Sequence, residues 1–298
     1  MTKYQIASTL SEKQIELDIA KYFAWITPPG LKKPFDILDV DEDITGADLL
    51  YKSVIPIYMQ CKVSQGLKPI SEISASNRKN RSQLEDIREF RNDNELSDNP
   101  ILYFKLRQKA KNAEDFQHNI LMSYANTGYS HAFYLAPLTL TKKDYNDALF
   151  KSRFYFNDPF YIQDLMSIDQ RRWRSYIGSI PHLREHVSII PHEKVDTHEH
   201  YYAFSQNGTD ISWHSPEYLE QGPRRLSDIV PDIIQLGLNR NYVSSFETVS
   251  IRLREMASFN QVDLGNENAL QIIQSHGKLL LKKYDIRQIL FVFNHENL

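Results

Sequence analysis

Hydrophobic and polar positions vary along the first part of the chain with two different periods. Residues 9–25 predict a helix, because Ser11 is a suitable N-cap and apolar side chains recur every three or four positions after it. Residues 47–51 and 55–63 are short, mainly apolar runs that predict two strands. A turn at residues 52–53 would join these strands into a hairpin.

The remainder of the first half continues in the same way. Residues 64–99 are polar and rich in Ser, Asn, Arg and Glu, which predicts a long insertion containing one short helix. A strand, a helix and a strand are predicted next, at 100–107, 113–125 and 132–138. Helices and strands thus alternate, which favours an α/β fold: a central mixed sheet flanked by helices. We assign this core to residues 1–140.

The second half, residues 141–298, has a different pattern and predicts an α+β extension. Asn207-Gly208 separates two strand-like runs, so a hairpin is predicted near 200–214. Helices are predicted over 227–284, one of them starting at a capping box formed by Ser244 and Glu247. A final strand is predicted at 287–293. No flexible linker divides the halves, so the extension is either a second domain or part of the first.

Composition narrows the class of protein without naming a function. Apolar residues make up 41% and charged residues 24% of the 298 residues, which is typical of a globular protein. Cys61 is the single cysteine, so an internal disulfide and a cysteine-based zinc site are both excluded. The sequence has neither a secretory signal nor an apolar run of membrane-spanning length, and we expect a cytoplasmic protein without membrane contact. The net charge of −3 leaves nucleic-acid binding open.

Four polar residues form the most informative constellation. Asp48 stands at the start of one predicted strand, and Gln60 and Lys62 lie two apart on the next, so their side chains share a face. The predicted hairpin would bring the three together. Glu16, on the preceding helix, can face the same point, and Glu12, one turn earlier on the same face, is its alternative. The alternative is that these residues have no function and form the solvent-exposed face of a hairpin. The apolar run before Gln60 instead favours a central strand.

This set of side chains suits the hydrolysis of a phosphodiester. Mg²⁺ or Mn²⁺ prefers oxygen ligands and retains several waters. Asp48 would anchor the ion, the Gln60 side chain and the Cys61 backbone carbonyl would complete the protein's ligands, and Glu16 would hold a metal-bound water. Lys62 would orient the attacking water.

The pattern resembles the PD-(D/E)XK superfamily, which includes restriction endonucleases and phage-defence nucleases. Its metal site combines a helical Glu, an Asp at the start of a strand and a D/E/Q-x-Lys on the following strand, which match Glu16, Asp48, Gln60 and Lys62. The resemblance covers residues 9–138. Ala47 stands where the family name has Pro, and Gln60 replaces the commoner acid, which removes one negative charge from the metal site.

The resemblance implies a restriction-endonuclease-like core and a metal-dependent endonuclease. It favours DNA over RNA as the substrate and a role in restriction or antiviral defence, with a homodimer or a partner protein of a defence system left open. The rival hypothesis is a nuclease-like module that binds nucleic acid or protein without cutting.

Other polar residues are weaker candidates. Gln117 could touch the site from the predicted helix, and Lys105 and Arg107 could contact substrate phosphates; surface or structural roles are the alternative for each. Several histidines between positions 182 and 214 match no standard zinc spacing, and we expect them to be structural. A calcium loop in the acidic segment near Asp36 and Asp39 is disfavoured because the glycine and terminal Glu of such loops are absent.

Overall fold

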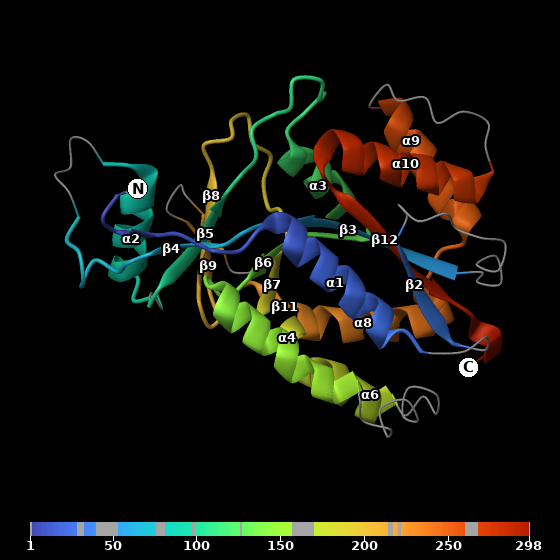
Figure 1. The fold of residues 1–298 in the computed structure, drawn as a ribbon. Coiled ribbons are helices and arrows are strands. Elements are labelled where there is room, and N and C mark those ends of the chain that lie inside the picture. The colour runs from blue at the N-terminus through green and yellow to red at the C-terminus, as the bar shows by residue number, and fades with distance from the viewer. Residues whose placement is uncertain are drawn as a thin grey trace.

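A computed structural model gives the fold of most of the chain (Figure 1). It describes residues 2–28, 33–39, 53–75, 81–96, 99–125, 127–156, 170–213, 217–219, 222–259 and 268–297. Asp48 and the predicted strand at 47–51 lie outside these ranges. The described residues form an α/β structure built around two six-stranded sheets.

The central sheet carries the residues of interest. Its strand order is β11-β7-β6-β3-β12-β2. β3 and β6 are parallel, and every other neighbouring pair in this sheet is antiparallel. The bounds are β2 Phe35–Asp39, β3 Ser53–Cys61, β6 His131–Pro137, β7 His186–Ile189, β11 Arg224–Arg225 and β12 Arg287–Phe293.

The second sheet is fully antiparallel and has the order β1-β4-β5-β8-β9-β10. Helix α2 (Gln83–Asp93), which the polar insertion contributes, packs against it. The strands are β1 Gln5–Ile6, β4 Gln65–Leu67, β5 Ile101–Lys105, β8 Tyr201–Ser205, β9 Ile211–Trp213 and β10 Glu217–Tyr218.

Helices cover both faces of the central sheet (Figure 1). On one face lie α1 (Glu12–Ile26) and α8 (Leu226–Leu238), with α4 (Lys142–Phe156), α6 (Gln170–Ser179) and α7 (Pro181–Arg184) packed on the same side. On the other lie α3 (Gln117–Ala125), α9 (Phe246–Phe259) and α10 (Ala269–Tyr284). Short 3-10 turns occur at Arg240–Tyr242 and His295–Asn297.

Several elements agree closely with the sequence-based predictions. The Ser11 side chain accepts a hydrogen bond from the Gln14 backbone N–H (3.2 Å) and caps α1 as expected. Gly208 has a φ of +67° in the turn between β8 and β9, which explains why glycine is suited to that hairpin. The last predicted strand matches β12 residue for residue.

Other elements differ from prediction, the largest difference being the neighbours of β3. The sequence predicts a hairpin between 47–51 and 55–63, but β12 and β6 occupy the two edges of β3 along 53–59 and 57–61. The antiparallel partner of β3 is therefore a strand from the far end of the chain.

Two helices also differ from prediction. α4, whose surface is largely polar, was not predicted as a helix. α9 is capped by Ser245, whose hydroxyl accepts a hydrogen bond from the Thr248 N–H (3.2 Å), and not by Ser244, whose backbone instead bridges to Val54.

We expect Gly237→Ala to destabilise the protein by about 1–3 kcal/mol, although alanine is the better helix former. A Cβ at Gly237, the penultimate residue of α8, would overlap the ring of Phe293. Gly178, the penultimate residue of α6, is the matched control, because the nearest atom to its added Cβ, the Ser227 carbonyl oxygen, lies 3.8 Å away. Urea denaturation of both variants measures the effect; equal stability of the two would contradict the close packing of α8 on β12.

Candidate active site

The candidate site lies at the carboxyl end of β3, the strand between β6 and β12. Gln60 and Lys62 are almost fully buried, with exposed fractions of 0% and 4%. They share the face that carries Tyr58, which α3 covers, whereas the Cys61 side chain packs on the opposite face against α1. Polar side chains at such positions require partners, because burying an unpaired polar group is costly.

Gln117 supplies those partners from α3. The Lys62 ammonium donates to Gln117 Oε1 (3.3 Å), and the Gln117 amide donates to Gln60 Oε1 and to the Tyr284 carbonyl. Gln60 Nε2 donates in turn to the Cys61 carbonyl (3.1 Å). The structure thus brings together three of the residues that the sequence singled out.

Lys62 is held where its charged form is disfavoured. Burial lowers the pKa of its ammonium, opposed by the negative charges of Glu12 and Asp285 and assisted by the positive charge of Arg107. Among the described residues, no carboxylate lies within ion-pairing distance of Lys62. The Nζ atom lies 5.8 Å from the centroid of the Tyr134 ring. An under-compensated buried ammonium of this kind is suited to orienting an anion or a water molecule, or to exchanging a proton.

Glu16 approaches the same end of β3 from α1, which covers the opposite face of the sheet. Its side chain is 12% exposed and lies 3.8 Å from the Arg287 guanidinium. Burial raises the pKa of the Glu16 carboxyl, and the negative charge of Asp285 raises it further. The positive charges of Arg287 and Lys13 oppose this shift.

Asp285 is a residue of this site that the sequence reasoning missed. It caps α10 and comes just before β12, whose first residue, Arg287, pairs with Met59 of β3. Asp285 Oδ2 accepts a hydrogen bond from Arg107 (2.5 Å). The sequence around Asp285 shows only an acid between a predicted helix and a predicted strand. The neighbouring residues do not indicate that this strand lies beside β3.

The remaining candidates are placed as follows. Lys105 forms a surface ion pair with Glu199 (2.6 Å), and Asp39 bonds to Arg287. His182 and His186 are buried in the core. Asp48 and His214 lie outside the described residues. The described part of the chain contains no group of three or more His, Cys, Asp or Glu side chains that could hold a metal ion.

The donor chemistry nonetheless fits a hydrated divalent cation. Mg²⁺ needs only one or two carboxylates when waters fill its other positions. Glu16 and Asp285 supply two carboxylates. Burial is the main cause of the raised pKa of Glu16, and the negative charge of Asp285 adds to it; a bound cation would offset both effects. The Gln60 and Cys61 oxygens are engaged in hydrogen bonds within the protein, so they are weaker candidates.

Comparisons with known proteins add nothing to these observations. Within the described residues, every helix is too short or too polar to cross a membrane. Searches against protein-family models, curated protein sequences and solved structures each returned no match.

Proposed function

We propose that this chain is a metal-dependent endonuclease that hydrolyses phosphodiester bonds of DNA, built on a restriction-endonuclease-like core. One observation carries the proposal: Gln60 and Lys62 lie buried at the end of a central strand, joined through Gln117, with the carboxylates of Glu16 and Asp285 nearby. A purely structural role would not explain a lysine buried without a carboxylate partner in the described structure.

The arrangement of strands supports the same proposal if Asp285 takes the role that the sequence assigned to Asp48. The resemblance places an acid at the start of one strand and the Gln-x-Lys on the strand that follows it, whereas β12 comes later in the chain than β3. In the described structure the antiparallel neighbour of β3 is β12, and the acid just before it is Asp285. We therefore assign to Asp285 the anchoring role that the sequence assigned to Asp48.

Each residue then has a defined role. Glu16 and Asp285 would hold Mg²⁺ or Mn²⁺, which when bound supplies an activated water and neutralises charge that develops on the phosphate. Lys62 orients the attacking water, and because burial lowers the pKa of its ammonium, the neutral amine can accept a proton from that water. Gln117 fixes the Lys62 side chain, and Arg107, half exposed beside Asp285, contacts a substrate phosphate.

A second candidate function is a nuclease-like module that binds nucleic acid or protein without cutting. The specific observation in its favour is that Gln60 Oε1 and the Cys61 carbonyl already have hydrogen-bond partners. These two oxygens would have to exchange those partners to ligate a metal.

The test is cleavage of plasmid, linear duplex, single-stranded DNA and RNA, with Mg²⁺ or Mn²⁺ and with chelator. Wild type is compared with Asp285→Asn and Asp48→Asn, since asparagine keeps the shape of aspartate and removes its charge. We expect metal-dependent cutting of DNA that Asp285→Asn abolishes. If only Asp48→Asn abolishes cutting, the anchoring role returns to Asp48. If wild type cuts none of the substrates, the binding module is the better description.

Asp285→Gly should make the fold more stable while it removes cleavage. Asp285 has a φ of +56° at the carboxyl end of α10, a conformation and a place that favour glycine and disfavour a negative charge. We expect a gain of about 0.5–1 kcal/mol in the free energy of unfolding, measured by denaturant titration.

Glu95 provides the matched control, because it too has a positive φ (+53°) and it lies after α2, away from the site. Glu95→Gly should stabilise the fold similarly and leave cleavage unchanged. A loss of stability in Asp285→Gly would indicate that the Arg107 ion pair is structural, contrary to the proposed role.

A further inference from the structure

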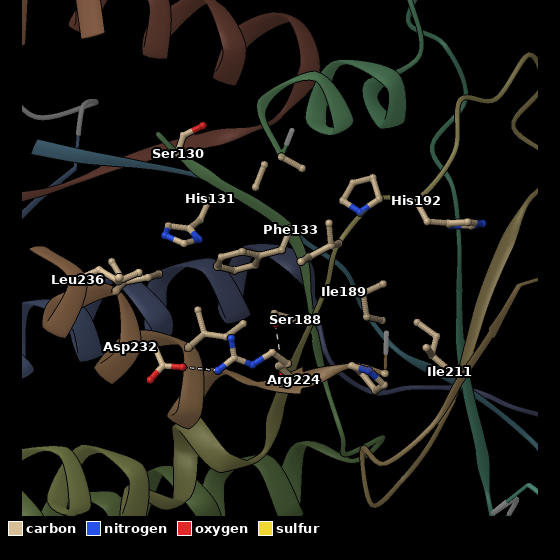
Figure 2. A pocket seen from close by; sticks show the side chains of 18 of the residues that line it. Ser130, His131, Phe133, Ser188, Ile189, His192, Ile211, Arg224, Asp232 and Leu236 are labelled. Carbon is tan, nitrogen blue, oxygen red and sulfur yellow. Dashed lines mark hydrogen bonds and ion pairs between the residues drawn. The ribbon is translucent and has the colours of Figure 1, made fainter. Parts of the chain in front are cut away.

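A cavity lies apart from the candidate active site. It has a volume of about 1370 Å³ and opens at the amino end of β6, between β7 and α8 (Figure 2). His131, at the start of β6, lies level with Ile57 of β3, whereas Gln60 and Lys62 lie at the other end of that strand. None of the residues that line the cavity belongs to the candidate active site.

The cavity has no net formal charge. Its lining contains one arginine and one acid, Arg224 and Asp232, which form an ion pair with each other (Figure 2). Burial lowers the pKa of His131, and the positive charge of Arg224 lowers it further, so the imidazole is neutral at pH 7. A strongly anionic ligand would meet Asp232, and a cationic one would meet Arg224.

The polar groups offer both donors and acceptors. A neutral imidazole presents one of each, and neither ring nitrogen of His131 has a hydrogen-bond partner among the residues that the structure describes. His131 is partly buried at the wall of the cavity, where an imidazole without a protein partner can bond to a ligand that complements it. Arg224 and Asp232 add a second donor and acceptor on the facing side of the cavity (Figure 2).

The rest of the lining is largely apolar. Ile189, Phe133 and Leu236 line the interior (Figure 2), and the side chains of Ile190 and Tyr242 are 49% and 64% exposed. Exposed apolar and aromatic side chains beside convergent polar groups are typical of sites for flat, amphipathic ligands. The volume exceeds that of most small-molecule sites, which leaves room for a sugar beside a ring.

We propose that this cavity binds a neutral, planar heterocycle of the nucleobase class, with His131 and the Arg224–Asp232 pair reading its hydrogen-bonding edge. The base could belong to a free nucleoside or to an unpaired position of a nucleic-acid strand, since both present the same chemistry. The inference does not depend on the proposed nuclease site, because the two sites share no residue.

The test is isothermal titration of the full chain with adenosine, guanosine, cytidine and uridine at millimolar concentrations, and with single-stranded oligonucleotides in the presence of chelator. We expect binding that His131→Leu weakens roughly tenfold, the size expected for losing one or two hydrogen bonds. His198→Leu is the matched control, since His198 pairs with Glu199 outside the cavity and its loss should change nothing.

Each outcome decides the proposal. Binding of nucleosides that His131→Leu weakens supports a small-molecule ligand, and binding of oligonucleotides alone with the same dependence supports a base from a strand. No binding of either probe, or binding that His131→Leu leaves unchanged, would overturn the proposal. If His131→Leu does not fold, Tyr242→Ala replaces it, because that exposed side chain can be removed without disturbing the core.

Discussion

Replacing Lys62 with methionine is expected to abolish metal-dependent cleavage without lowering the stability of the fold. Loss of a group that orients the nucleophile and accepts its proton typically lowers the rate by roughly 10²–10⁴-fold. Methionine fills a similar volume and removes a buried ammonium whose desolvation disfavours the folded state. We therefore expect the free energy of unfolding to be unchanged or to rise by about 1 kcal/mol.

Lys68→Met is the matched control, because Lys68 is an exposed lysine just after β4 that pairs with Glu72. It should retain nearly full activity and stability. Cleavage rates under single-turnover conditions and urea denaturation together separate the two effects. A Lys62→Met variant that still cuts at the wild-type rate would exclude Lys62 from the reaction.

The protein should lose stability steeply as the pH falls from about 6.5 to 4. Burial lowers the pKa of His118, His186 and His276 to about 4 in each case. In the unfolded chain these side chains titrate near 6.5, so below that pH the unfolded state binds more protons than the folded state. Each histidine then costs on the order of 3 kcal/mol by pH 4, and the combined loss is a large part of the stability of an ordinary domain.

The measurement is the free energy of unfolding at closely spaced pH values. We expect a slope of three protons or more within this window, since burial also lowers the pKa of His182 well below its usual value, and no contribution from these groups above pH 7. His118→Gln should reduce the slope by about one proton, whereas His198→Gln, at a partly exposed position, should leave it unchanged. A flat profile between pH 6.5 and 4 would mean that these histidines can take up protons in the folded state.

Local sequence patterns predicted most of the elements, because those elements depend on short-range effects. The cap of α1 at Ser11 and the turn at Asn207-Gly208 each involve residues within a few positions of one another. α4 was missed because its surface is mostly polar and its apolar stripe is weak. Ser244 and Ser245 are adjacent and equally suitable as caps, so only the bridge between Ser244 and Val54 decides between them.

The candidate site was predicted only in part, because some of its contacts depend on residues that are far apart in the sequence. Gln60 and Lys62 are two apart on one strand, and their common face follows from strand geometry alone. Their contact with Gln117 depends on how α3 packs across β3 and β6, which the family resemblance suggested and the local pattern did not. Asp285 lies at the site because β12 pairs with β3. The pairing of two distant strands cannot be predicted from a local sequence pattern.

The position of β12 between β2 and β3 has a consequence for how the protein is made. During synthesis β2, β3 and β6 leave the ribosome long before residues 287–293, so the central sheet cannot close until β12 has been made. Until then the facing edges of β2 and β3 lack their partner strand, and unpaired edges of this kind can add strands of other chains. The same delay keeps Asp285 away from Lys62, so an incomplete chain would lack the assembled site.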